Sequence, residues 1–471
     1  MSAQCGVASA EESERSTSTL TESKVEPDWK LPMKIEHRVA EIIAQQERNG
    51  WPFLADLARQ YVEHLDADAD AIYQDIKSLL GHYYLAKSVV DKPYKKDGTL
   101  TKMAEDYGDV GGPFGRIEWH ELELTKHAKV AERLVQIGWE PTAYTATGVP
   151  QIKPDGEPCP NLDKVIDGLG SKLSKYTKCV HRSNQIKGWL EALRPDGRVP
   201  AGANPNGTNT GRMTHKVVAN VPKASEDVFF GKEMRSLFTH RGQGYKLVGF
   251  DAEGLELRIA AHYINSEAFT DALINGDKSQ GTDPHTRVLD ACRPCGVETR
   301  DEAKSCVYST VYGASPRKVA SILNLDQASG EQIIQAVESV FPGISTLKPN
   351  VEKAASRGYL IGLDGRKIWM RYDADGKLMK HKALNYLFQS GGGIAMKMVL
   401  CILDNKIKQR GLDVTFVGNI HDEVQAEVAI DDISRYNSSV HEAFDEATKF
   451  LKLRCPLAGE VQSGETWAET H

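Results

Sequence analysis

Apolar and polar residues alternate in one stretch of the chain that predicts a β-hairpin. Residues 414–428 read VTFVGNIHDEVQAEV, so two alternating runs flank a turn with three ionisable residues, His421, Asp422 and Glu423. Residues 245–251 read YKLVGFD and predict a buried strand that ends on Asp251. One acidic residue at a turn is ordinary, but three ionisable residues between strands suited to burial raise the question of what they bind.

Helical periodicity covers most of the remaining chain. Apolar positions at helical spacing predict helices near 34–48 and onward to about 85, then at 121–137, 162–194, 253–264, 299–325, 329–340, 382–408 and 437–452. Loops rich in Gly, Pro, Asn or charge are expected at 91–118, 141–161 and 204–223. Residues 1–28 are small and polar without periodicity, which is typical of a disordered leader.

Composition changes this picture in one region only. The chain has 471 residues, of which 40% are hydrophobic and 26% charged, and a net charge of -7; these values fit a globular protein of two or three domains. Between 161 and 235, however, 13 Lys and Arg stand against 7 Asp and Glu. Part of this excess lies at helical spacing and forms either a solvated face or a track for phosphates. The residues concerned are Lys172, Lys175, Lys178, Arg182 and Lys187.

The eight cysteines are scattered along the chain, which favours a reducing compartment. Cys292 and Cys295 form a lone CxxC with no second pair nearby, so we expect two free thiols and no four-ligand zinc site. No run of 18 apolar residues predicts a membrane span, and the N-terminus lacks the regions of a signal peptide. We therefore expect no membrane partner and a cytoplasmic location, that of the host cell if the protein is viral.

Two carboxylates end apolar β-segments far apart in the sequence. Either Asp251 or Asp422 alone is most simply a turn or cap residue. If both project into one cleft, they repel each other unless a cation neutralises them. Carboxylate oxygens suit Mg²⁺, and two such ions about 3.5–4 Å apart can activate an attacking oxygen and stabilise a leaving one.

The helix TRDEAKSCVYSTVYG at 299–313 is the most informative single stretch. Thr299 and Glu302 form a capping box that fixes its start. Cations and aromatic rings then recur every four residues, with the cations nearest the N-terminus, where the helix dipole attracts anions. These residues are Arg300, Lys304, Tyr308 and Tyr312. The pattern fits a triphosphate with its sugar and base, and it fits equally an amphipathic helix with core tyrosines.

In combination these stretches resemble the polymerase portion of a family A DNA polymerase. The resemblance is closest to the replicative polymerases of short-tailed phages and extends more distantly to bacterial DNA polymerase I. It runs from residue 35 to residue 471, over more than nine tenths of the chain. The motifs that carry it occur in the family's order: TGRMTH, FDAEGLELRIAAH, RDEAKSCVYSTVYG, LDGRK, ALNYLFQS and HDE.

The resemblance implies a two-metal polymerase site. Asp251 and Asp422 match the metal-binding carboxylates, and Ala252 matches the residue whose carbonyl binds the same metal as Asp251. Together these residues are expected to hold two Mg²⁺ ions. Glu423 matches a nearby third carboxylate that assists catalysis.

The resemblance also assigns residues to the incoming dNTP and to the DNA. Glu256 matches the sugar gate that disfavours ribose, and family structures pair it with the match of Tyr312. Arg300, Lys304 and His285 match triphosphate contacts, and Lys304 also matches the residue that protonates pyrophosphate. Tyr308 matches the residue at the sugar's 3′ side, where tyrosine implies tolerance of dideoxynucleotides. Contacts to primer-template DNA are expected from Arg212, Asn385, Gln389 and His421.

The implied fold is α+β, a right-hand polymerase with an antiparallel-sheet palm, helical fingers and a helical thumb. The expected parts are a disordered leader (1–34), a thumb (35–190, with a short insertion at about 85–118), a palm (191–262 and 409–471) and fingers (263–408). The short insertion argues against thioredoxin as a partner. The short segment before residue 35 implies no 3′–5′ exonuclease in this chain, so editing would need a separate polypeptide, and replisome proteins are further expected partners.

Two rival functions remain open at this point. A single-subunit RNA polymerase shares the palm, but Glu256 and the TGR segment argue against it. A DNA-binding accessory protein that has lost catalysis is the second rival. Retention of Asp251, Asp422 and Lys304, together with Arg300, argues against that alternative.

Overall fold

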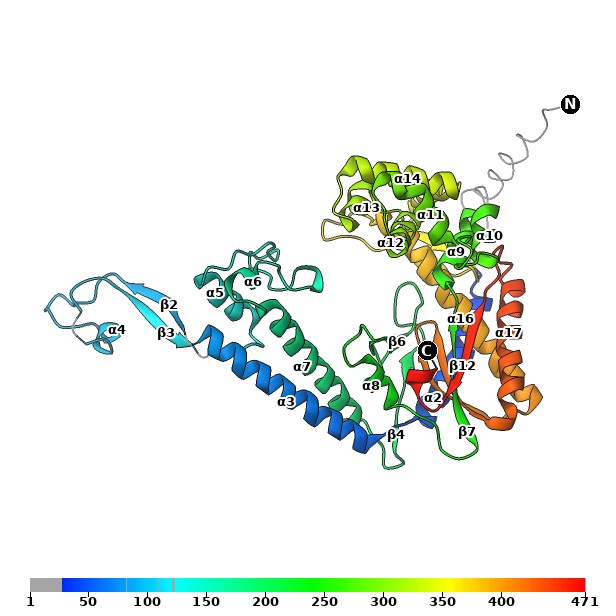
Figure 1. The fold of residues 1–471 in the computed structure, drawn as a ribbon, viewed down its shortest axis with the longest axis horizontal. Helices are drawn as coiled ribbons and strands as arrows, with labels where there is room; N and C mark the ends of the chain where they lie inside the picture. Colours follow the sequence, from blue (N-terminus) through cyan, green and yellow to red (C-terminus); the bar gives the residue numbers. More distant parts are fainter. Residues whose placement is uncertain (1–27, 82, 109, 121–122, 471) are drawn as a thin grey trace. The chain divides into compact units, whose positions relative to one another are not determined.

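The computed structural model describes residues 28–470 except 82, 109 and 121–122, and it forms two compact units (Figure 1). One unit contains residues 28–54 and 192–470, and the other contains residues 55–191. The predicted leader therefore lies largely outside the described residues, and its last positions are already helical, because α2 begins at Lys30.

A four-stranded antiparallel sheet lies at the centre of the first unit, with strand order β10-β11-β7-β12. Its strands are β7 (Tyr245–Ala252), β10 (Val414–Ile420), β11 (Glu423–Ala429) and β12 (Gly459–Gly464). The predicted strand and hairpin are confirmed. The edge strand β12 was not predicted, because its sequence GEVQSG lacks an apolar alternation.

Three helices pack on or beside this sheet: α2 (Lys30–Asn49), α16 (Ala383–Arg410) and α17 (Ile433–Phe450). Helix α16 contacts both α2 and α17, while α17 contacts β11 and β12. Figure 1 shows α17 beside β12. Phe444 of α17 packs edge-on against Phe250 of β7, with ring centroids 5.8 Å apart. In the described chain one helix, at 380–410, is long and apolar enough to cross a bilayer, but 83% of its most apolar window is buried inside the protein, as in a core helix.

The remaining helices of this unit, among the described residues, are α8, which precedes β7 in the sequence and contacts η5 (Trp467–Glu469), and seven helices that follow β7. They are α8 (Gly231–Ser236), α9 (Leu255–Ile264), α10 (Glu267–Ile274), α11 (Pro284–Cys292), α12 (Arg300–Val311), α13 (Pro316–Ile322), α14 (Gln327–Val340) and α15 (Ile344–Ala355). Thr299 and Glu302 form the predicted capping box of α12. Cys292 and Cys295 are free thiols, as predicted.

Short strand pairs and single 3-10 turns complete the first unit. The strand pairs are β1 (Trp51–Pro52) with β4 (Arg198–Val199), β5 (Ala203–Asn204) with β6 (Thr214–His215), and β8 (Tyr359–Ile361) with β9 (Lys367–Trp369). The 3-10 turns are η2 (Arg293–Cys295), η3 (Lys380–Lys382), η4 (Ile430–Asp432) and η5 (Trp467–Glu469).

The second unit is built on two long helices that lie side by side (Figure 1). It comprises α3 (Ala55–Leu80), α7 (Leu169–Glu191), the hairpin β2 (Tyr83–Val90) and β3 (Phe114–His120), the helices α4 (Lys102–Glu105), α5 (His127–Gln136) and α6 (Leu162–Val165), and the 3-10 turn η1 (Pro154–Gly156). The stretch expected as a loop at 91–118 therefore contains a short helix and part of a hairpin.

The basic face of α7 is largely an internal feature of this unit. Three of its five predicted residues form ion pairs with aspartates of α3: Lys172 with Asp75 (2.5 Å), Lys175 with Asp68 (3.0 Å) and Lys187 with Asp66 (2.8 Å). Most of the basic residues on this face of α7 are thus paired with acidic residues of α3. The hypothesis that they form a track for phosphates therefore loses most of its support.

One domain boundary differs from the prediction. Residues 35–54 were assigned with the thumb, but α2 packs on α16 and β10, so they belong to the first unit. Assignment of the units to thumb, palm and fingers stays a prediction.

We predict that Gly249→Ala destabilises the sheet. A methyl group on Gly249 would lie 2.1 Å from Nε2 of Gln425 and 2.7 Å from the carbonyl oxygen of Thr470. Such overpacking in a core costs about 1–3 kcal/mol, measurable as a lower free energy of unfolding in urea. Gly188→Ala is the control, since an added methyl on this exposed helical glycine meets nothing and should raise stability by up to about 1 kcal/mol. Equal stability of the two variants would contradict the prediction.

Candidate active site

The sheet register brings the two predicted metal ligands together. In the β7–β11 pair, Asp251 lies opposite Glu423, and the backbone N–H of Ala252 donates to the carbonyl oxygen of Asp422 at 3.2 Å. Asp422 directly follows His421, whose φ of +60° gives the tight turn between β10 and β11. Both aspartates are half-buried. Two residues far apart in the sequence therefore sit at adjacent strand ends.

The donor set fits a divalent ion only together with a substrate. Among the described residues, no group of three or more His, Cys, Asp or Glu side chains is placed to hold a metal ion. Two carboxylates and one backbone carbonyl are nevertheless an ordinary protein share for Mg²⁺, which keeps waters and substrate phosphates in its shell. Asp251, Asp422 and the carbonyl of Ala252 meet this description.

Glu423 differs from its two neighbours because its side chain is buried, with 4% of the residue exposed. Its Oε1 accepts hydrogen bonds from Nε1 of Trp467 and from Nε2 of Gln425, the latter at 2.7 Å. Its Oε2 lies 3.5 Å from the guanidinium of Arg235. The structure thus ties the predicted third carboxylate to the interior. Arg235 and Trp467 were not predicted as site residues, because both contacts are formed between segments distant in sequence.

Two of the three predicted triphosphate residues, Arg300 and Lys304, lie along the first turns of α12. Lys304 is exposed, whereas Nη2 of Arg300 donates to Asp283 at 2.7 Å. Burial alone would raise the pKa of Asp283, but hydrogen bonds from Thr286 and Arg300 outweigh it and bring that pKa to about 2. Asp283 therefore stays ionised and holds Arg300 at the N-terminal end of the helix.

His285 of α11, the third predicted triphosphate residue, lies beside Tyr308 of α12. Their rings are nearly parallel with centroids 6.1 Å apart. Burial, and then the nearby Arg300 charge, lowers the pKa of His285 to about 4, so the imidazole is neutral at pH 7. Its Nδ1 has no hydrogen-bond partner within the described residues. Burial, followed by the charges of Glu256 and Asp422, raises the pKa of Tyr308.

Glu256 is held from two sides. The Tyr312 hydroxyl donates to Oε2, which is the contact that the resemblance implies, and Nη2 of Arg212 donates to Oε1 at 2.9 Å. Burial, and then the hydrogen bond to Glu256, raises the pKa of Tyr312. Arg212 also lines a small cavity of about 30 Å³ together with His421, Asp422 and Gly393. The predicted sugar gate and the predicted primer contacts therefore meet in one place.

The other predicted DNA contacts lie on α16 and lead toward this cavity. Asn385 and Gln389 are half-exposed and one helical turn apart, and Gly393 continues the same stripe in the part of the helix from 383 to 401, which is otherwise buried. Spacing of four residues puts the two side chains on the face that ends at the cavity.

Lys397 was not predicted and holds the loop that carries Arg212. Its ammonium is 1% exposed and donates to the Gly211 carbonyl at 2.7 Å and to Glu36 at 2.6 Å. Arg366 donates to the same Glu36 at 2.6 Å. The only signal in the sequence is a lone lysine within the apolar run GGGIAMKMVL. A buried charge of this kind needs such partners to be tolerated.

His215, in the TGRMTH stretch, is a second residue without a prediction. Its Nε2 accepts from the backbone N–H of His421 at 3.2 Å, and the two rings meet edge-on at 5.1 Å. Burial, and then the neighbouring His421, lowers the pKa of His215 to about 4. A neutral acceptor therefore supports the turn that presents Asp422.

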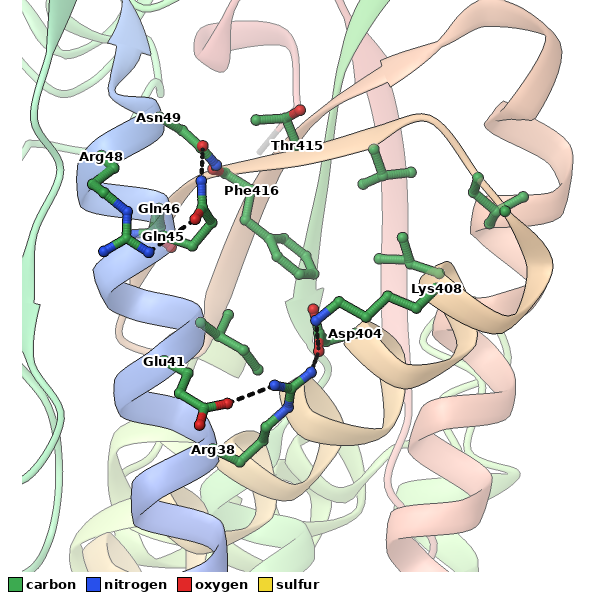
Figure 2. A pocket seen from close by; sticks show the side chains of 15 residues that line it. Arg38, Glu41, Gln45, Gln46, Arg48, Asn49, Asp404, Lys408, Thr415 and Phe416 are labelled. Carbon is green, nitrogen blue, oxygen red and sulfur yellow. Dashed lines mark hydrogen bonds and ion pairs between the residues drawn. The ribbon is translucent and has the colours of Figure 1, made fainter.

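A larger cavity of about 500 Å³ lies elsewhere in the first unit, between α2, α16 and β10 (Figure 2). Most of its charges are already paired, since Arg38 contacts both Glu41 and Asp404, and Lys408 contacts Asp404 at 3.0 Å. None of the predicted site residues lines it. Its size alone does not make it the site.

Comparisons with known proteins agree with this geometry. The family model described as "DNA polymerase family A" matches residues 150–469. The chain is 26% identical to a DNA-directed DNA polymerase of Escherichia phage Phieco32, over 94% of this chain and 99% of the relative. It is 25% identical to that of Escherichia phage T7 (93% and 70%) and 26% identical to DNA polymerase I of Bacillus caldotenax (93% and 49%).

A solved structure, the POL domain of Pol1 from M. smegmatis in complex with DNA primer-template and dNTP, has a similar fold. Its TM-score is 0.75 at 19% identity, over 92% of this chain and 70% of that one. The predicted right-hand α+β fold is thereby confirmed. The chain belongs to DNA polymerase family A.

It is a DNA-directed DNA polymerase, which sets aside the two rival functions. Enzymes of this family generally use divalent metal ions.

We predict that stability falls as the pH is lowered from 7 to 5. The pKa values of His215, His262 and His285 lie near 4 in the folded protein, chiefly because of burial, against a usual 6.5. Between about pH 6.5 and pH 4 the unfolded chain therefore binds protons that the folded chain does not, so acid favours unfolding. Urea unfolding midpoints at pH 7.5, 6.0 and 5.0 should fall steadily.

The variant His285→Gln is the control for this prediction. It removes one of the three depressed pKa values and should reduce the pH dependence of the midpoint. A midpoint that is constant or rises toward pH 5 in the wild type would contradict the proposed burial of these neutral rings.

Proposed function

We propose that this polymerase extends a primer 3′-hydroxyl with dNTPs on a DNA template, at a site that binds two Mg²⁺ ions through Asp251, Asp422 and the carbonyl of Ala252. The observation that carries the proposal is the β7–β11 register, which sets both aspartates at adjacent strand ends. Bound Mg²⁺ supplies neutralisation of the phosphates and a lower pKa for the primer hydroxyl. The protein's own side chains orient the triphosphate and the duplex, donate a proton to the pyrophosphate and select the sugar of the incoming nucleotide.

Arg300, Lys304 and His285 hold the triphosphate. When a triphosphate binds, the Arg300 guanidinium either releases its hydrogen bond to Asp283 or contacts both Asp283 and the phosphates. Lys304 is exposed and supplies a positive charge and a proton to the departing pyrophosphate. His285 is neutral, so it contributes a hydrogen bond without adding positive charge. The α12 N-terminus favours the same anion.

Tyr308, Tyr312 and Glu256 select the sugar. The bond from Tyr312 to Glu256 fixes the carboxylate where a 2′-hydroxyl would collide. Tyr308 brings a phenol to the 3′ side of the sugar, where it replaces a missing 3′-hydroxyl contact and so admits dideoxynucleotides.

Arg212, Asn385, Gln389 and His421 contact the primer-template duplex. Acceptors in the minor groove are nearly alike for all correct pairs, so residues of this kind sense pairing geometry and not sequence. In the free protein the Arg212 guanidinium is paired with the Glu256 carboxylate. Arg212 must therefore leave Glu256 to contact the duplex when DNA binds.

We further propose that the described residues carry no 3′–5′ editing activity. The candidate site at Asp251 and Asp422 is assigned to polymerisation alone, and an excision assay on a mismatched primer terminus tests this proposal. A cytoplasmic site of action, separate editing or replisome partners, and independence from thioredoxin stay predictions.

We predict that Asp422→Asn lowers the rate of primer extension in Mg²⁺ by more than about 100-fold, the scale for loss of one charge-stabilising group, while DNA affinity changes little. Single-turnover extension of a matched primer measures the rate. Asp431→Asn, at an exposed position beyond the far end of β11, is the matched control and should behave as wild type. The same assay with a mismatched terminus tests excision. Wild-type extension by Asp422→Asn would refute the metal assignment.

We predict that Tyr308→Phe lowers ddNTP incorporation relative to dNTP by at least about tenfold, the equivalent of one lost hydrogen bond of about 1.4 kcal/mol. Competition between ddNTP and dNTP on one template measures the ratio. Discrimination against rNTPs serves as the internal control and should not change, because Glu256 is untouched. An unaltered ddNTP ratio would exclude this role for Tyr308.

A further inference from the structure

The C-terminal segment of the described chain returns to the four-stranded sheet and buries a tryptophan there. Trp467, in η5, is 0% exposed and packs against Trp51 and Phe238, with ring centroids 5.0 and 5.6 Å away. Its backbone N–H donates to the Phe238 carbonyl at 2.9 Å. The indole is therefore fixed in position by neighbours on several segments.

This indole is one of three side chains that contact the Glu423 carboxylate, two as hydrogen-bond donors and one as an ion-pair partner. Nε1 of Trp467 and Nε2 of Gln425 donate to Oε1, and Arg235 approaches Oε2. Gln425 is itself fixed, because its Oε1 accepts from the Thr470 hydroxyl at 2.9 Å. Both oxygens of Glu423 are engaged, which leaves this carboxylate poorly suited to binding a metal ion directly.

Arg235, on α8, provides the only nearby charge of opposite sign among these partners. It is 4% exposed, its Nε donates to the Pro222 carbonyl at 2.8 Å, and its guanidinium lies 4.3 Å above the Trp467 ring. A buried carboxylate without such partners is strongly destabilised. The cation, the indole and the carboxylate thus form one unit, the Arg235–Glu423–Trp467 cluster.

The cluster lies beside the predicted metal ligands. Glu423 follows Asp422 directly and faces Asp251 across the β7–β11 pair. Three carboxylates at two strand ends repel one another, and a fixed buried cation lowers the cost of bringing them together. Hydrogen bonds that fix Glu423 also fix the backbone of the turn at His421 and Asp422.

We propose that Arg235 and Trp467 are positioning residues for the catalytic aspartates and act through Glu423, which serves as an anchor and not as a metal ligand. This inference rests on the proposed two-metal function of Asp251 and Asp422. Partners that orient metal-binding groups typically affect metal affinity or activity by about 10- to 100-fold. Displacement of a reacting group by about 1 Å has a similar effect.

The chain offers a matched pair of variants to test this. Trp467→Phe keeps an aromatic ring but removes the N–H that binds Glu423. Trp51→Phe removes the same volume from the same aromatic cluster, but Nε1 of Trp51 has no hydrogen-bond partner within the described residues. Both variants should lower the melting temperature by similar amounts, so stability alone does not separate them.

We expect Trp467→Phe to reduce kcat about 10-fold or more and to raise the Mg²⁺ concentration for half-maximal rate about 10-fold, with KM for dNTP within about twofold of wild type. Mn²⁺ binding to a stalled complex with a dideoxy-terminated primer and dNTP, followed by electron paramagnetic resonance, should weaken in parallel without any turnover. Trp51→Phe should match wild type in kcat, Mg²⁺ dependence and Mn²⁺ binding.

Glu423→Gln provides the second test, in case Trp467→Phe does not fold. It keeps the size and an acceptor for Trp467 but loses the charge that pairs with Arg235, so we expect weaker Mn²⁺ binding and lower kcat. Equal kcat and Mn²⁺ affinity in wild type and Glu423→Gln, or in Trp467→Phe and Trp51→Phe, would overturn the inference. Absence of metal-dependent extension in the wild type would instead refute the proposed function.

Discussion

The antiparallel pairing of β7 with β11 is the constraint on which the active site depends. Its register sets Asp251 opposite Glu423 and links Ala252 to Asp422 through a backbone hydrogen bond. Because side chains alternate between the two faces of a sheet, a slip of one residue would turn Asp251 to the wrong face. Burial of Val248 and Phe250 on one strand and of Val424 and Ala426 on the other opposes that slip.

Helix α16 forms the common support behind this sheet. It contacts α2, α9 and α17, and its buried Lys397 connects Glu36 of the N-terminal helix to Gly211, the residue before Arg212. Removing one member of a buried charged group leaves another uncompensated, which costs several kcal/mol. The segment before the second unit is therefore part of the site's support, although its Glu36 lies 176 positions before Arg212 in the sequence (212 minus 36).

Local patterns in the sequence were sufficient for the elements that carry the chemistry. A short apolar run predicted β7, period-two alternation predicted the hairpin, and the capping box of Thr299 and Glu302 fixed the start of α12. Contacts between distant segments left no such signal. The ion pairs of α7 with α3, and the partners of Glu423, depend on which helices and strands become neighbours. Arg235 and Trp467 thus appear in the sequence as one charge and one aromatic residue without a pattern.

The most direct test of the central claim is the number of divalent ions bound beside the paired strand ends. Mn²⁺ bound per enzyme is counted by electron paramagnetic resonance in a stalled complex with dideoxy-terminated primer, template and the next dNTP. The account predicts two ions per site in the wild type, as in other two-metal centres, and at least one fewer in Asp251→Asn. An undiminished count in Asp251→Asn would contradict the account.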